Sequence, residues 1–215
     1  MLSIKWSLKA FASSKPLVKK LIKNQKPNHT LDQAFYVNDY IFDLDIKSIF
    51  SKQWVFVGHI SRIPKHGDYF LFNIGKESII IIRDENDNIH AHYNVCRHRG
   101  YRICLENEGN KKLLICPYHA WSFATDGQLV GVQDYENAYQ PPFDKSEWGL
   151  IEVAQIGQYM GTIWATWDKD APSFEDYLGD AKFAFDLGLC AWDGSDSGTE
   201  LLGSVQKWIA PCNWK

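Results

Sequence analysis

Two short segments, each joining one cysteine to one histidine, constrain this chain more than any other feature of its sequence. The first is Cys96-Arg97-His98, and the second is Cys116-Pro117-Tyr118-His119. Each segment offers one thiolate and one imidazole at a spacing typical of a loop. Two such loops can clamp one common object, so the fold must bring both segments to the same place.

Three interpretations of these four residues are open. In Rieske centres two cysteines hold one iron of a 2Fe–2S cluster and two histidines hold the other. Structural zinc also takes two cysteines and two histidines, but its ligands usually come as cysteine pairs and histidine pairs. The four residues can also be unrelated. Because each pair here is mixed, the pattern favours the 2Fe–2S cluster, with Cys96, His98, Cys116 and His119 as its ligands.

The sequence around the two pairs consists of short β-type runs separated by turn residues. Nine Trp and ten Tyr are many for this length and suit a β-rich, tightly packed domain. The Asp126-Gly127 pair between two runs is a hairpin signal. We predict an antiparallel β-sandwich, with strands over 55–58, 68–74, 78–83, 89–95, 113–116, 122–125, 128–132, 150–156 and 162–167.

Helical patterns flank this β region. Asn38 or Asp39 can begin a leading helix over about 39–52, and Ser173 can begin a trailing helix that continues to about Phe185. Residues 137–145 read as a long loop, and an apolar run over 201–209 starts a new element. The expected organisation is a leader over 1–30, a helical segment over 31–53, a Rieske domain over 54–167, and a linker helix with the start of another domain over 168–215.

Charge and cysteine content add broad limits. Residues 1–30 hold seven of the 23 basic residues and none of the 26 acidic ones. We expect a solvated, flexible leader, and neither a nucleic-acid nor a membrane partner. No apolar run approaches the ~20 residues that span a bilayer. Five cysteines without a signal peptide predict a reducing cytoplasm, with Cys104, Cys190 and Cys212 as small packed residues.

Longer stretches resemble the α subunits of Rieske non-haem iron oxygenases of the ring-hydroxylating type. The resemblance runs from about Leu31 to the last residue, and the CRHRG and CPYH blocks are together highly specific. The matching stretches are QWVFVGHISRIPKHGDYF, NVCRHRGYRIC, ICPYHAWSFATDGQLVGV, DKSEWGL, GTIWATWDKDAP and VQKWIAPCNWK. One departure is Ala120, where the family most often has glycine.

The resemblance implies a role for each residue of the two loops. Cys96 and Cys116 match the ligands of the inner iron, whereas His98 and His119 match those of the outer, more exposed iron. Surrounding residues match those that fix the loops and rings: Arg97, Arg99, Gly100, Pro117 and Trp121.

Differences from the respiratory-chain Rieske proteins predict a low potential. Those proteins have two additional cysteines where this chain has Tyr101 and Tyr118, and hydrogen-bond donors where it has Trp121 and Phe123. Fewer hydrogen bonds to the sulfurs leave the reduced cluster less stabilised. We expect a value toward the lower end of about −150 to +300 mV, which suits electrons from NAD(P)H through a reductase or ferredoxin.

The resemblance also indicates what this chain lacks. In the family, the mononuclear Fe(II) that activates dioxygen is bound by two histidines and a carboxylate located after the point matched by 211–215. We therefore expect a partial α subunit with no catalytic residue of its own, whose full protein is a homo-oligomer, trimer-like or with a small β subunit. The expected function is electron transfer within an aromatic-ring dioxygenase. Alternatives are a quaternary-amine monooxygenase and a stand-alone Rieske carrier.

A second histidine pair is less informative. His90 and His92 lie two residues apart and share one face of a predicted strand. They could bind a metal, but no carboxylate is patterned with them, so a surface strand is the favoured interpretation.

Overall fold

The structure is a computed structural model that describes residues 16–139, 143–190, 198–203, 205, 206, 208, 210–213 and 215. The chain divides into two compact units, one comprising Met1–Phe50 with Gln206–Lys215 and the other comprising Ser51–Val205. The described part of the basic leader is helical over 16–23, which the sequence analysis does not predict. Within the described residues, no helix has the length and apolar character needed to cross a membrane.

The first unit contains the leading helix. After α2 (Ala34–Val37), α3 spans Asp39–Ser48, and a 3-10 turn η1 follows over Phe50–Lys52. The Asn38 side-chain oxygen accepts hydrogen bonds from the backbone N–H groups of Tyr40 (3.0 Å) and Ile41 (3.3 Å). Asn38 therefore begins α3 as its N-cap, as the sequence predicts.

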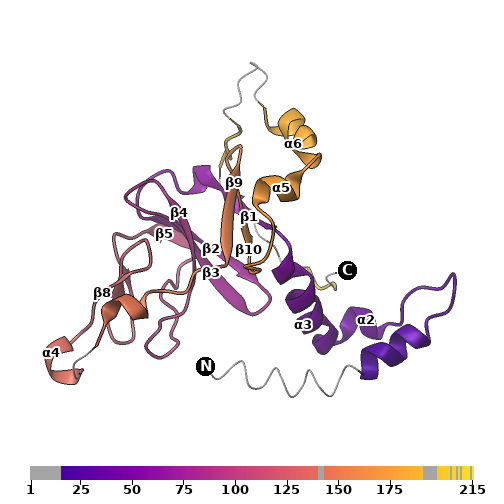
Figure 1. The fold of residues 1–215 in the computed structure, drawn as a ribbon, viewed down its shortest axis with the longest axis horizontal. Coiled ribbons are helices and arrows are strands. Elements are labelled where there is room, and N and C mark those ends of the chain that lie inside the picture. The colour runs from indigo at the N-terminus through magenta and orange to yellow at the C-terminus, as the bar shows by residue number, and fades with distance from the viewer. Residues whose placement is uncertain are drawn as a thin grey trace. The chain divides into compact units, whose positions relative to one another are not determined.

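The described residues of the second unit form three antiparallel sheets with the strand orders β1-β10-β9, β4-β3-β2-β5 and β6-β7-β8. Figure 1 labels the strands of the first two sheets. The predicted mainly antiparallel β fold is confirmed. The strands are β1 (Val55–His59), β2 (Asp68–Ile74), β3 (Glu77–Arg83), β4 (Ile89–Tyr93), β5 (Glu108–Asn110), β6 (Leu114–Ile115), β7 (Ser122–Phe123), β8 (Leu129–Gly131), β9 (Gln155–Tyr159) and β10 (Thr162–Thr166).

The central strand β3 organises two cores. Its isoleucines alternate between the two faces of the sheet, and all four are fully buried. Ile80 and Ile82 pack in the cluster that also holds Cys96 and Cys116. Ile79 and Ile81 pack against β1 and β10 on the opposite face. Cys96 and Cys116 therefore belong to the first of these two cores.

Two predicted elements are divided in the structure. The run over 150–156 is not one strand: β9 begins at Gln155, and before it only Glu152 forms an isolated bridge to β4. The trailing helix is two helices, α5 (Phe174–Leu178) and α6 (Ala181–Leu189), because Gly179 has a φ of +46° that interrupts helical geometry. Ser173 caps α5, accepting from the Asp176 N–H at 3.2 Å.

Some segments predicted as loops or connections contain short helices. The predicted loop over 137–145 begins within α4 (Tyr135–Ala138) and ends in a 3-10 turn, η3 (Lys145–Trp148); residues 140–142 lie outside the described residues. Another 3-10 turn, η2 (Ile60–Arg62), follows β1. Residues 201–203 form neither helix nor strand, and the rest of the predicted run over 201–209 is described only in part.

Candidate iron–sulfur site

The two cysteine–histidine segments form loops with the same backbone geometry. The first loop lies between β4 and β5, and the second joins β6 to β7. In the first, the Cys96 N–H donates to Tyr101 O (2.8 Å) and the Gly100 N–H donates to Cys96 O (2.9 Å). In the second, the Cys116 N–H donates to Trp121 O (2.8 Å) and the Ala120 N–H donates to Cys116 O (2.9 Å).

The four candidate ligands meet between these loops. Cys96 and Cys116 are each 2% exposed, and their thiols lie within hydrogen-bonding reach of each other. His98 and His119 are half-buried, with ring centroids 4.7 Å apart. The thiols are buried and the imidazoles are partly exposed, which matches the expected inner and outer iron.

Side-chain environment also suits a metal cluster. Within the described part of the chain, the buried Nδ1 atom of His98 has no hydrogen-bond partner. Burial, with repulsion from His119 and Arg99, lowers the pKa of His98 and favours the neutral imidazole that binds metal. Burial raises the pKa of the Cys96 thiol to about 11, although the N–H groups of His98 and Arg99 donate to its sulfur. Together the residues fit a 2Fe–2S cluster, whose iron deprotonates its thiol ligands.

Residues around the ligands hold the loops in place. Trp121 is buried, stacks on the His98 ring with centroids 5.0 Å apart, and donates from Nε1 to the Tyr139 hydroxyl at 3.1 Å. Arg97 donates to the carbonyl of Gly149 at 2.9 Å, which ties the first loop to the segment after η3. Arg99, Gly100 and Pro117 are exposed.

Tyr101 and Tyr118 bring the two loops into direct contact. Their ring centroids are 5.6 Å apart, and both rings are exposed. These are the positions at which respiratory-chain Rieske proteins have cysteines, so an aromatic contact stands here where those proteins have a disulfide. The Tyr118 ring also contacts His119, with centroids 3.7 Å apart.

Asn94 is a residue of the site that the sequence analysis missed. Its fully buried side chain accepts at Oδ1 from the N–H groups of Ile103 (3.0 Å) and Cys104 (2.9 Å), and donates from Nδ2 to Cys104 O (2.8 Å). Asn94 therefore joins the two ends of the first loop through its side chain. The signal was an asparagine inside a β-type run just before Cys96, because asparagine is depleted in strands.

Ala120 adopts the conformation that explains why glycine is usual there in the family. Its φ is +55°, and the equivalent Gly100 has a φ of +75°.

We expect Ala120→Gly to raise the free energy of unfolding by about 0.5–1 kcal/mol by relieving strain. Gly100→Ala should lower it by a similar amount, because an added Cβ there meets no atom within 4 Å and adds only strain. Urea unfolding of the two variants and the parent chain, all cluster-loaded, measures these free energies. Equal free energies of unfolding in all three proteins would contradict the prediction.

Comparison with known proteins supports the same assignment. Residues 53–143 match the family model of the Rieske [2Fe-2S] domain. The chain is 40% identical over 185 residues to the biphenyl 2,3-dioxygenase α subunit of Rhodococcus jostii (strain RHA1), covering 86% of this chain and 39% of that protein. It is 38% identical to the benzene 1,2-dioxygenase α subunit of Pseudomonas putida, covering 86% of this chain and 40% of that protein.

Solved structures agree with the sequence relatives. Naphthalene 1,2-dioxygenase from Rhodococcus sp. superposes with a TM-score of 0.80 at 37% identity, over 91% of this chain and 44% of that one. The quaternary ammonium Rieske monooxygenase CntA, bound to γ-butyrobetaine, gives a TM-score of 0.66 at 30% identity, over 73% of this chain and 44% of that one.

Fold, loops and relatives together define a Rieske 2Fe–2S protein. The chain belongs to the family of ring-hydroxylating dioxygenase α subunits, and spans about two fifths of the length of the curated relatives it matches. The family and the cofactor predicted from the sequence are confirmed.

Proposed function

We propose that this chain is the electron-transfer portion of an aromatic-ring-hydroxylating dioxygenase α subunit. Its cluster ligands are Cys96 and Cys116 at the inner iron and His98 and His119 at the outer iron. One observation supports the proposal: two loops with the same backbone hydrogen bonds carry two buried thiols and two half-buried imidazoles whose ring centroids are 4.7 Å apart. When bound, such a cluster accepts and donates one electron at a time.

The protein surface around the histidines suits transient partners. Exposed apolar side chains surround the two loops: Val95, Tyr101, Leu105, Ile115 and Tyr118. An electron donor, a reductase or ferredoxin, needs close approach to the half-buried rings of His98 and His119. In the full protein, a homo-oligomer with or without a small β subunit, the same edge would deliver electrons to a mononuclear iron in a neighbouring subunit. Five free cysteines suit a cytoplasmic location.

The dioxygenase assignment is favoured over the quaternary-amine alternative by similarity. Biphenyl and benzene dioxygenase α subunits reach 38–40% identity over 86% of the chain, whereas the CntA structure reaches 30% over 73%. The extended similarity on both sides of residues 53–143 also disfavours a stand-alone Rieske carrier.

Replacing an outer ligand tests the assignment. We expect His119→Cys to retain a cluster but to lower its reduction potential by on the order of 100 mV, because a thiolate adds negative charge where neutral imidazole stood. Redox titration followed by visible absorption measures the change. His66→Cys, at an exposed histidine outside the two loops, is the matched control and should leave the potential unchanged. An unchanged potential in His119→Cys would remove His119 from the ligand set.

A further inference from the structure

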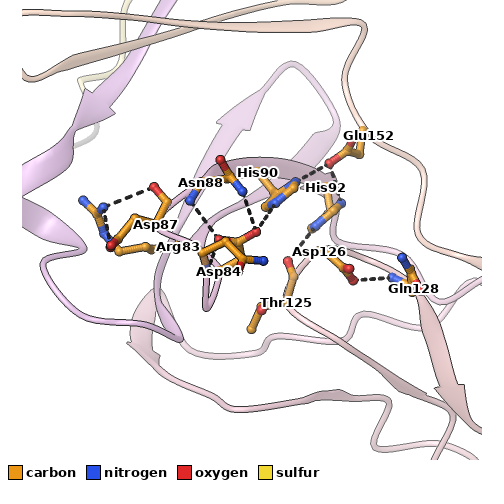
Figure 2. A network of polar contacts seen from close by, with 11 residues as sticks. Arg83, Asp84, Asp87, Asn88, His90, His92, Thr125, Asp126, Gln128 and Glu152 are labelled. Atoms are coloured by element: carbon orange, nitrogen blue, oxygen red, sulfur yellow. Dashed lines mark hydrogen bonds and ion pairs between the residues drawn. The ribbon is translucent and has the colours of Figure 1, made fainter.

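A second group of potential metal ligands lies on β4. His90 and His92 project from the same face of this strand, and their rings stack with centroids 5.5 Å apart and an interplanar angle of 8° (Figure 2). The His92 side chain is fully buried, and that of His90 is 21% exposed. A fully buried histidine is not the surface-strand residue that the sequence suggests.

Backbone pairing brings Glu152 to this histidine pair. The Tyr93 N–H donates to Ile151 O (2.8 Å), and the Val153 N–H donates to Ala91 O (2.9 Å). Between these two bonds, Glu152 lies directly opposite His92 as a pair whose own backbone groups are not hydrogen-bonded to each other. In antiparallel sheets such pairs have the closest side chains. The Glu152 Oε1 atom is 2.9 Å from His90 Nδ1 and 3.5 Å from His92 Nδ1.

The far nitrogen of each ring is already bonded to an acceptor. His92 Nε2 is 3.0 Å from the Thr125 carbonyl oxygen, which can only accept, so Nε2 carries the proton. His90 Nε2 is 3.0 Å from Asp84 Oδ2 (Figure 2). Asp84 also accepts hydrogen bonds from the Asn86 N–H and from Asn88 Nδ2, so its carboxylate acts as an acceptor.

With a neutral His90, these contacts leave three acceptor atoms facing one another. A neutral His92 has a lone pair at Nδ1, and this buried atom has no hydrogen-bond partner among the residues that the structure describes. Protonation of His90 would satisfy its own contact with Glu152 but would supply no donor to His92. A cation between the three atoms satisfies all of them.

We propose that His90 Nδ1, His92 Nδ1 and the Glu152 carboxylate bind a divalent transition-metal ion of the Zn²⁺ type, separate from the iron–sulfur cluster. The three ligand atoms lie within 4.8 Å of one another. Two ligands of a tetrahedral zinc, each about 2.0–2.1 Å from it, are about 3.4 Å apart, and the two nitrogen–oxygen separations lie on either side of that value. Two histidines and one glutamate leave a fourth position for water.

The surroundings are those of a metal site. Histidines that bind metal usually donate their other N–H to a carboxylate or a backbone carbonyl, as His90 does to Asp84 and His92 to Thr125. The Glu152 side chain is 49% exposed, which gives an ion access from solvent. A bound ion would join β4 to the segment at 151–153 through side chains as well as backbone.

Zinc titration of the cluster-loaded 215-residue chain tests the proposal. After a mild chelator wash, we expect calorimetry to show one Zn²⁺ bound per chain with no loss of iron, and Zn²⁺ to raise the melting temperature. Glu152→Gln and His90→Gln should each weaken binding at least about tenfold. His66→Gln, at an exposed histidine paired with Asp87, is the matched control and should bind as the parent does.

Three results would overturn the proposal. They are no Zn²⁺ binding by the parent chain, equal affinity in the parent and in both variants, and binding that releases iron in proportion. Iron and sulfide content, measured in every sample, separates this test from that of the proposed function. Co²⁺ in place of Zn²⁺ adds a visible spectrum that should be lost in Glu152→Gln, and circular dichroism confirms that each variant is folded.

Discussion

Cys116→Ser is expected to reduce the iron and acid-labile sulfide content of the purified chain at least about tenfold, the largest effect of any single substitution considered. Cys116 is 2% exposed and lies within hydrogen-bonding reach of the Cys96 thiol, as expected of two thiolates that bind the same iron. A serine hydroxyl is a much weaker ligand for iron than a thiolate. Colorimetric iron and sulfide assays on the purified variant measure the loss.

The matched control for this substitution is Cys190→Ser. Cys190 is a half-buried free cysteine at the end of α6, outside both loops. The Cys190→Ser variant should retain the full iron and sulfide content of the parent chain. Equal cluster content in the two variants would show that Cys116 is not a ligand.

Asn94→Ala is expected to lower the free energy of unfolding by about 3 kcal/mol or more. The substitution leaves the N–H groups of Ile103 and Cys104 and the Cys104 carbonyl without their partner in a buried region. Each unsatisfied buried group costs about 1–3 kcal/mol. Because these bonds close the first loop, we also expect faster loss of the cluster on heating.

Asn73→Ala is the control for this second substitution. Asn73 lies in β2 but is exposed, so its replacement should change stability by less than about 0.5 kcal/mol. Urea unfolding of both variants, followed by tryptophan fluorescence and by cluster absorption, gives the comparison. Similar stability of Asn94→Ala and the parent chain would contradict the role assigned to Asn94.

Local sequence patterns predicted much of the fold. The apolar run of β2 between turn residues gave its bounds as Asp68–Ile74, and Asn38 and Ser173 cap helices as predicted. The mixed cysteine–histidine pairs lie on two facing loops because their spacing suits loops and not helix faces. These features depend on residues close together in the chain.

Features that depend on long-range contacts were missed or placed wrongly. The polar strand β5 has no apolar signal and exists through its backbone pairing with β2. The apolar run over 150–156 looks like one strand, but Glu152 pairs with β4 before β9 begins at Gln155. For the same reason the sequence could not show that Glu152 joins His90 and His92, which precede it by some sixty residues.

The most direct test of the central claim is analysis of iron, zinc and acid-labile sulfide in the purified chain. We predict two irons and two sulfides per chain, in a reddish-brown protein that a suitable NAD(P)H-linked reductase reduces by one electron. Zinc bound by Cys96, His98, Cys116 and His119, with no labile sulfide, would contradict the account.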